Sequence, residues 1–544
     1  MEIPSTSKGT LVLVLHAHLP FVRHPEHENF LEEDWLFEAV TEVYLPLLDV
    51  FSGLRRDAVP FRLTLSLSPT LISMLRDPLL QGRTERYLEK SLELAEKEIR
   101  RVRGISGLVP LAAMYRARLS RALESFRFYK RDLAAAFKCF QEEGFLEIIT
   151  CPATHPFLPL LMENPTAARA QLSVALDQHE KIFGARPEGI WLPECGYVPG
   201  VDDILKDFDV RYFFLDAHGL LHGEPPPKFG VFAPVRCPSG VHAFGRDREA
   251  SRRVWCGKTG YPADVHYRDF YRDIGFDLEP GYIGPYIQPD GKGKFTGIKY
   301  HRVTGRPEKE IYQREAALKK AALHAEDFLE GLRLRTKKIL AATQRGPLFV
   351  CPFDAELFGH WWFEGPEWLD HLMRRAAVDP LAPALATPLD VLREGGPVQT
   401  VVPSASSWGE GGFNAVWLDE KNHWIYRELH LAAERMGLLA ERRKNARGLE
   451  ERILNQAVRE LFLAQSSDWA FLLKTGASEE YAGRRIREHL ENFCFLCDAA
   501  ESGENPLPRL DELAGKNNLF PEADFRLFRE EGQKKSPTPP KRRE

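Results

Sequence analysis

The chain has 544 residues, of which 44% are hydrophobic and 28% are charged, an ordinary composition for folded domains. This length exceeds what one hydrophobic core supports, so it predicts two or three domains. The net charge of −5 is small for such a chain and argues against a nucleic-acid-binding surface.

The chain carries no signal for a membrane or for export. No apolar run is long enough to span a bilayer, and the run 11–15 is too short for a signal peptide. The eight cysteines are scattered, and Cys151 and Cys351 lie in apolar runs, as free thiols of a reducing compartment do. The pair Cys494 and Cys497 favours packing in a helix. We therefore expect a cytoplasmic protein that binds neither a membrane nor nucleic acid.

Short apolar runs recur along the chain, and polar residues follow each of them. The runs cover residues 11–20, 61–69, 145–156, 189–196, 210–218, 347–361 and 399–406. Their apolar residues are consecutive, which is typical of parallel strands covered on both faces. Helical patterns such as 200–208 lie between them and predict an α/β barrel or a doubly wound sheet. Barrel active sites lie at the C-terminal ends of strands, where this chain places His16, His18, His155, Glu194, Asp216, His218, Asp354 and Glu356.

Three segments depart from this alternation of strands and helices. Residues 76–144 are helical and charged, and the C-terminal part is again helical, with apolar residues at i, i+3 and i+4 in 424–443. The Gly/Pro-rich stretch 219–262 indicates an irregular lid or binding loop. The predicted domains are a first barrel part 8–75, a helical insertion 76–144, a second barrel part 145–408, a C-terminal helical domain 409–530 and a disordered tail 531–544.

Glu194 and Asp354 each follow a hydrophobic run and lie among aromatic residues. Such a pair suits glycoside chemistry, in which one carboxylate attacks the sugar and the other protonates the leaving oxygen. Flat faces on which sugar rings can pack come from Trp191, Phe353, Phe358, Trp361, Trp362, Trp408 and Trp417. The competing interpretation is that Glu194 caps a helix beginning near Val201 and that the tryptophans are core residues.

A second alternative is a metal site. His16 and His18 are one residue apart on a predicted strand, point the same way, and could bind a metal with His155 or Asp354. That set would favour a metal-dependent deacetylase or a mannosidase-like hydrolase. Hydrogen bonding of the same histidines to sugar hydroxyls is equally compatible with their spacing.

Five stretches in this order resemble the motifs of glycoside hydrolase family 57, and most closely those of its 1,4-α-glucan branching enzyme group. They are 16-HAHLPFVRH-24, 151-CPATHPFLPLL-161, 190-IWLPECGY-197, 351-CPFDAELFGHWW-362 and 404-SASSWGEGG-412. The resemblance covers about residues 10–530. It implies an α/β fold, an incomplete (β/α)7 barrel with a helical insertion and a C-terminal all-helical domain.

The resemblance also assigns the chemistry. It implies a retaining double displacement without metal or cofactor, in which Glu194 is the nucleophile and Asp354 the general acid/base. The predicted substrate-binding residues are His16, His18, His155, Arg272, Trp361, Trp408, Trp417 and Asp468. The predicted substrate is an α-glucan such as amylose or a glycogen-like polymer, which would place the enzyme in glycogen biosynthesis.

One departure concerns the loop within 219–262, where branching enzymes of the family often carry a tyrosine at the tip. Here the aligned tip is Lys228-Phe229. The sequence thus predicts a 1,4-α-glucan branching enzyme, with an α-amylase or a 4-α-glucanotransferase as the alternative that uses the same carboxylates. Alternatives of another class are a metal-dependent deacetylase-like enzyme and a non-catalytic glucan-binding protein.

Overall fold

The computed structural model describes residues 8–288 and 291–529, so the predicted tail 531–544 lies outside the described residues. The chain forms two compact units, each assembled from separate segments. Unit 1 comprises residues 1–65, 74–148 and 247–391, and unit 2 comprises residues 66–73, 149–246 and 392–544.

The larger sheet contains the first predicted strand at its centre, in the order β10-β1-β2-β3. Its strands are β1 (Thr10–Ala17), β2 (Leu63–Leu67), β3 (Leu146–Ile149), β10 (Leu348–Asp354) and the short β11 (Ala384–Leu385). β1 pairs in parallel with both β10 and β11. The side chains of residues 11–15 are fully buried, because β1 is covered on both faces. The predicted parallel sheet is confirmed.

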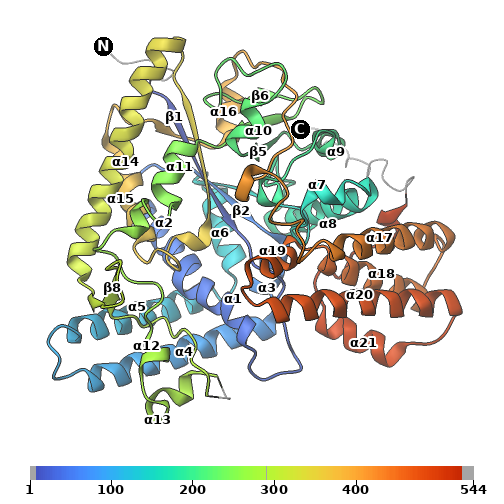
Figure 1. The fold of residues 1–544 in the computed structure, drawn as a ribbon, viewed down its shortest axis with the longest axis horizontal. Helices are drawn as coiled ribbons and strands as arrows, with labels where there is room; N and C mark the ends of the chain where they lie inside the picture. Colours follow the sequence, from blue (N-terminus) through green and yellow to red (C-terminus); the bar gives the residue numbers. More distant parts are fainter. Residues whose placement is uncertain (1–7, 289–290, 530–544) are drawn as a thin grey trace, which may run out of the picture. The chain divides into compact units, whose positions relative to one another are not determined.

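Figure 1 shows the helices of unit 1. They are α1 (Asp34–Ala39), α2 (Leu45–Arg56), α4 (Pro78–Arg101), α5 (Val109–Phe128), α6 (Leu133–Glu142), α11 (Arg248–Trp255), α12 (Ile274–Asp277), α13 (Pro280–Ile283), α14 (Arg314–Thr343), α15 (Gly365–Val378) and, at the end of the unit, α16 (Pro388–Glu394). The paired strands β8 (His301–Arg302) and β9 (Glu310–Ile311) form a separate hairpin. In the predicted insertion, α4 and α5 pack side by side and bury residues such as Leu88 and Leu119.

The second sheet has the order β4-β5-β7-β6. Its strands are β4 (Gly189–Ile190), β5 (Tyr212–Leu215), β6 (Val235–Arg236) and β7 (His242–Gly245). β4 and β7 are both parallel to β5. The same unit contains the helices α3 (Pro69–Leu75), α7 (Leu158–Leu161), α8 (Pro165–Phe183), α9 (Val201–Asp207) and α10 (Ala217–Leu221).

Two details of the prediction are wrong. The stretch 219–262 is not irregular throughout, because it contributes β6, β7 and α11. These elements are short, and Gly and Pro residues surround the two strands. The run 399–406 forms no strand. It makes only isolated bridges, of which Thr400 to Arg236 and Ser406 to Tyr197 are two.

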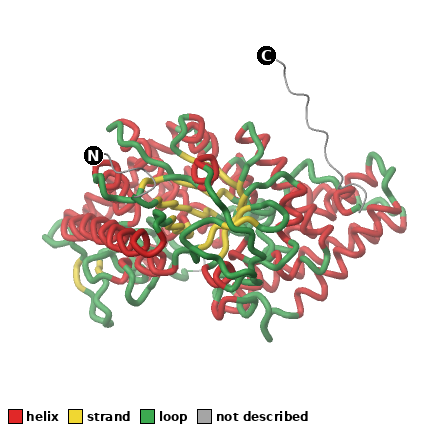
Figure 2. Tube along the Cα trace, turned by 90° about the horizontal axis from the view of Figure 1, so that it is seen from above, coloured by secondary structure: helices red, strands yellow, loops and turns green. Residues whose placement is uncertain are grey.

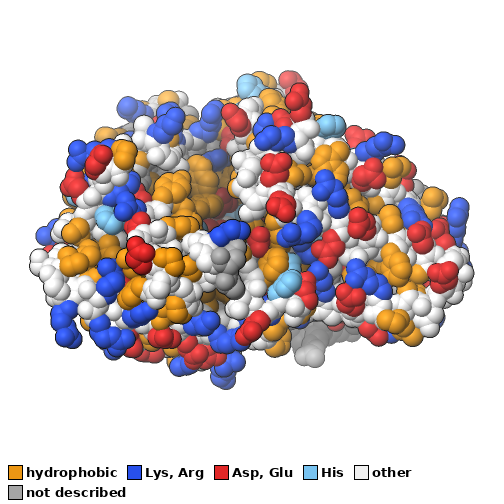
Figure 3. Space-filling model, turned by 60° about the horizontal axis from the view of Figure 1, so that its bottom comes forward, with side chains coloured by type: hydrophobic (Ala, Val, Ile, Leu, Met, Phe, Trp, Pro, Cys, Tyr) orange, Lys and Arg blue, Asp and Glu red, His pale blue; other side chains and the backbone are white. Residues whose placement is uncertain are grey.

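The C-terminal segment consists of helices and connecting loops, as predicted (Figure 2). Its helices are α17 (Trp424–Arg442), α18 (Leu449–Ala464), α19 (Ser467–Thr475), α20 (Glu479–Ser502) and α21 (Leu507–Lys516). α18 and α20 pack along each other, and both bury apolar residues, such as Leu461 of α18 and Phe493 of α20. In the described part of the chain, no helix has both the length and the apolar character needed to cross a membrane. Basic and acidic side chains are interspersed on the face shown in Figure 3.

Candidate active site

Glu194 follows β4 in a short turn with a rare backbone conformation. Its φ is 63° and its ψ is 21°, and the next residue, Cys195, also has a positive φ of 50°. Residues other than glycine seldom adopt this region, and doing so costs about 1–3 kcal/mol. His155 has the same kind of backbone, with a φ of 59°. Such outliers concentrate at functional sites, and here they occur at two predicted site residues.

The carboxylate of Glu194 accepts two hydrogen bonds from side chains. The indole Nε1 of Trp408 donates to Oε2 at 2.8 Å, and the hydroxyl of Ser467 donates to Oε1 at 3.1 Å. The main-chain N–H of Trp408 also donates to the carbonyl of Glu194 at 2.8 Å. Hydrogen bonds to a carboxylate favour its ionised form, which is the form that a nucleophile needs.

His155 completes this arrangement through Ser467. Its Nδ1 lies 2.9 Å from the Ser467 hydroxyl and 4.0 Å from Oε1 of Glu194. Because the hydroxyl proton of Ser467 points to Glu194, the hydroxyl must accept from an Nδ1–H of His155. The main-chain N–H of Ser467 also donates to the carbonyl of His155 at 2.9 Å. The predicted subsite histidine is therefore joined to the predicted nucleophile by a serine that sequence analysis did not single out.

The capping interpretation of Glu194 is wrong. α9 begins at Val201, its N-cap is Gly200, and no side chain caps it. The carboxylate of Glu194 is held by Trp408 and Ser467 instead.

Two side chains contact the ring of Trp408. The ring of Trp191 lies 4.9 Å from it, and the guanidinium of Arg246 lies 5.7 Å from its centre. Arg246 in turn donates to Asp216 at 3.3 Å, and Asp216 lies 3.1 Å from Nδ1 of His218. The predicted strand-end residues Asp216 and His218 are thus linked to Trp408 through Arg246.

In unit 1, Asp354 ends β10 directly beside the end of β1. Asp354 pairs in register with His16, and the rings of His16 and His18 are stacked 5.9 Å apart. Asp354 is half-buried, whereas His16 is buried. The predicted acid/base and two predicted subsite histidines therefore share one edge of the larger sheet.

Glu356 lies two residues beyond Asp354 and is buried. Tyr44 donates a hydrogen bond of 2.5 Å to its carboxyl group. Burial raises the pKa of Glu356 to about 7, although the hydrogen bonds from Tyr44 and from the main chain of His18 act to lower it.

Other predicted contacts in unit 1 have partners within the protein. Arg272 makes two hydrogen bonds to Asp277, of 2.7 and 2.8 Å. The side chain of Trp361 is 45% exposed, and its ring lies edge-on to that of Trp255 at 5.9 Å. Trp361 can therefore offer a ring face to a sugar, whereas Arg272 would have to leave Asp277 to reach one.

The remaining predicted contacts lie in unit 2. Trp417 is buried and stacks on Phe157 at 4.4 Å, so in this arrangement it packs as a core residue does. Asp468 accepts a hydrogen bond of 2.5 Å from Ser466 at the start of α19. Phe229 is half-buried in a turn closed by the N–H of residue 232.

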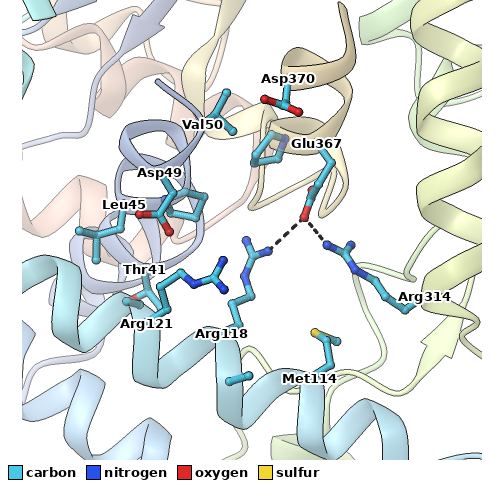
Figure 4. A pocket seen from close by; sticks show the side chains of 14 residues that line it. Thr41, Leu45, Asp49, Val50, Met114, Arg118, Arg121, Arg314, Glu367 and Asp370 are labelled. Atoms are coloured by element: carbon cyan, nitrogen blue, oxygen red, sulfur yellow. Dashed lines mark hydrogen bonds and ion pairs between the residues drawn. The ribbon is translucent and has the colours of Figure 1, made fainter. Parts of the chain in front are cut away.

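A cavity of about 400 Å³ in unit 1 contains none of the predicted site residues (Figure 4). It is lined by α2, α5 and the first turns of α14 and α15, and Glu367 on its wall pairs with Arg314 and lies 3.7 Å from Arg118. Within residues 8–288 and 291–529, no three His, Cys, Asp or Glu side chains form a group that could hold a metal ion.

Chelation separates sugar chemistry from metal chemistry. If His16 and His18 line a sugar subsite, we expect activity on amylose to survive exhaustive treatment with a chelator. Elemental analysis of the purified protein should then find no stoichiometric metal. An inactive, metal-free protein that zinc or manganese restores would favour the deacetylase-like alternative.

Comparisons with known proteins show the family to which the chain is similar. The sequence profile described as "Glycosyl hydrolase family 57" matches residues 12–403, and "1,4-alpha-glucan branching enzyme, C-terminal" matches residues 428–528. A curated 1,4-alpha-glucan branching enzyme of Thermococcus kodakarensis is 30% identical over 94% of this chain and 77% of its own length.

Two solved structures are similar over nearly the whole chain. The alpha-amylase AmyC of Thermotoga maritima is 43% identical, with a TM-score of 0.90 and coverage of 96% of this chain and 99% of its own. The GH57-type branching enzyme of Pyrococcus horikoshii is 31% identical, with a TM-score of 0.86 and coverage of 98% of each chain. The resemblance seen in the motifs is confirmed, and the chain belongs to glycosyl hydrolase family 57.

Proposed function

We propose that the protein is a retaining 1,4-α-glucan branching enzyme that cleaves α-1,4 bonds and transfers the released chain to form α-1,6 branches. The observation that carries the proposal is Glu194, held in a strained turn with two hydrogen bonds to its carboxylate. The profile match at residues 428–528 and the branching-enzyme relatives support transfer to another glucan over hydrolysis.

In the proposed mechanism, Glu194 attacks the anomeric carbon while Asp354 protonates the leaving glycosidic oxygen. The 6-hydroxyl of an acceptor glucan then attacks the glucosyl-enzyme, and Asp354 takes its proton. Two displacements at the same carbon retain the α-configuration. In a glucan complex, the two carboxyl groups should lie about 5–5.5 Å apart, the separation typical of retaining enzymes.

Other residues of the chain orient the nucleophile and contact the sugar in these steps. Trp408 and Ser467 orient the carboxylate of Glu194, and we assign sugar-hydroxyl contacts to His16, His18 and His155. The incomplete (β/α)7 barrel remains part of the proposal. It is supported by the parallel pairing of Thr150, the residue after β3, with Ile190 of β4. We also propose the domain boundaries, the location in the cytoplasm and the role in glycogen biosynthesis that the sequence predicts.

An α-amylase is the second candidate, and two observations favour it. AmyC, at 43% identity, is described as an alpha-amylase, and no tyrosine lies between Tyr212 and Tyr261. Hydrolysis and transfer share the glucosyl-enzyme, so the outcome depends on whether water or a glucan hydroxyl reaches it. Incubation with amylose distinguishes them, because only transfer creates α-1,6 bonds.

The variant Phe229→Tyr tests whether the loop affects the balance between hydrolysis and transfer. A phenyl ring can shield apolar sugar faces, but it has no hydroxyl to hydrogen-bond an acceptor. We expect Phe229→Tyr to lower the ratio of reducing-end release to α-1,6 bond formation relative to the native enzyme. If the native enzyme already transfers with negligible hydrolysis and the variant matches it, the loop does not set the outcome.

A further inference from the structure

The helical segment between β1 and β2 contains an unusual turn that contacts the residues following the candidate acid/base. α1 and α2 are joined by the π-helical turn Val40–Tyr44, in which the N–H of Leu45 bonds to the carbonyl of Val40. The next residue is Pro46, which has no N–H to offer to the carbonyl of Glu42. The sequence 40-VTEVYLP-46 therefore widens the helix at this point, and π turns of this kind are frequent at functional sites.

This π turn is joined to the segment that follows Asp354 by three separate contacts. Tyr44 donates to Glu356 at 2.5 Å, and Nδ1 of His360 lies 2.6 Å from Oε2 of Glu42. Gly359 has a φ of +121°, and a Cβ there would lie only 1.8 Å from the carbonyl oxygen of Glu42. Only glycine fits so close to the turn.

Glu356 also contacts the end of β1. The main-chain N–H of His18 donates to its carboxyl group, in addition to the phenol of Tyr44. One buried side chain thus ties the end of β1, with His16 and His18, to the end of β10, with Asp354. Both hydrogen bonds are shielded from water, so losing one leaves a buried polar group poorly paired.

We propose that Tyr44 and Glu356 form a positioning pair, which holds Asp354 and His18 in register for proton transfer to the glycosidic oxygen. The inference rests on the proposed function and extends it to a residue outside the motifs, Tyr44. Neither residue needs to touch the substrate to act in this way.

The pair has a pH dependence that a purely structural contact lacks. The titratable groups that act on the carboxyl group of Glu356 are Tyr44 from the π turn and His18 from the end of β1. Asp354 lies two residues before Glu356, at the end of β10. Because burial raises the pKa of Glu356 to about 7, we expect its charge to change near neutral pH. That charge adds an inflection to the pH profile, since a nearby negative charge raises the pKa of the acid.

Two variants and a matched control test the pair through kinetics on amylose. We expect Tyr44→Phe to lower kcat about tenfold with KM changed less than about threefold, because it displaces the acid/base Asp354, whereas His18 is one of several proposed sugar contacts. The inflection near pH 7 should move to higher pH in Tyr44→Phe and disappear in Glu356→Gln. The control is Tyr282→Phe, which removes a phenol-to-carboxylate hydrogen bond of 2.8 Å to Glu98 in the same unit.

A second measurement does not depend on activity. Between pH 4.5 and about 7, folded Glu356 keeps a proton that the unfolded chain has lost, so stability falls as the pH rises through this window. Relative to the native protein, Glu356→Gln should gain thermal stability from about pH 5 to about pH 8. Tyr282→Phe should show no such trend.

The outcomes are separable. If the native enzyme turns over amylose, two results overturn the positioning pair. One is an unchanged pH profile in both variants, and the other is a loss of kcat in Tyr44→Phe equal to that in Tyr282→Phe. A native enzyme without activity on amylose overturns the proposed function, and the stability measurement then still reports whether Glu356 titrates as the pair requires.

Discussion

Replacing either candidate carboxylate is expected to remove nearly all activity on amylose. Glu194→Gln removes the nucleophile and should lower kcat by on the order of 10⁴-fold or more. Asp354→Asn removes the proton donor and should lower it by about 10²–10⁴-fold. Both variants should keep the native circular dichroism spectrum and nearly the native Tm, because neither side chain is part of the hydrophobic core.

An activated substrate separates the two roles. An aryl α-maltoside with an acidic phenol as leaving group needs little protonation, so Asp354→Asn should regain much of its first-step rate on it. Glu194→Gln should not, because it has no carboxylate to attack. The exposed residue Glu163 gives a control, Glu163→Gln, which should match the native enzyme. Substantial turnover by folded Glu194→Gln would contradict the assignment.

The second large effect is expected at Trp408. Trp408→Phe keeps an aromatic ring beside Trp191 but removes the N–H that bonds to Oε2 of Glu194. A hydrogen bond to a charged group contributes about 1.5–3 kcal/mol, which corresponds to a loss in kcat of about 10- to 150-fold.

A matched control exists in the same unit. Trp424 also donates its indole N–H, at 3.2 Å, but to the carbonyl of Lys421 and not to Glu194. Trp424→Phe should leave kcat within about twofold of the native value, since it removes only a surface contact. If Trp408→Phe is as active as Trp424→Phe, the indole does not assist Glu194. A rise in KM alone would make Trp408 a substrate contact only.

The position of the candidate carboxylates could be predicted from the sequence, but their partners could not. Glu194 and Asp354 stand out because each ends an apolar run, a local pattern that needs no tertiary information. The bond from Trp408 to Glu194 joins residues 214 positions apart, and the backbone at Glu194 depends on the turn around it. Ser467 was not predicted for the same reason, because it lies 273 positions from Glu194 in the sequence.

The sequence alone does not tell which aromatic residues are exposed to a sugar and which are buried. Trp361 and Trp417 are equally plausible sugar platforms in the sequence, yet one is 45% exposed and the other stacks on Phe157 in the interior. Burial follows from the neighbours that the fold supplies. The strand β7 was missed for a related reason, because its pairing with β5 outweighs the Gly and Pro residues around it.

The central claim is that the glucosyl-enzyme formed on Glu194 passes to a glucan hydroxyl. The most direct measurement incubates the native enzyme with amylose and counts reducing ends before and after enzymatic debranching. Transfer leaves the number of reducing ends unchanged, whereas each α-1,6 bond yields one new reducing end on debranching. We predict that new α-1,6 bonds outnumber the reducing ends released during the incubation. Reducing ends that rise without any gain on debranching would contradict the account and identify an α-amylase.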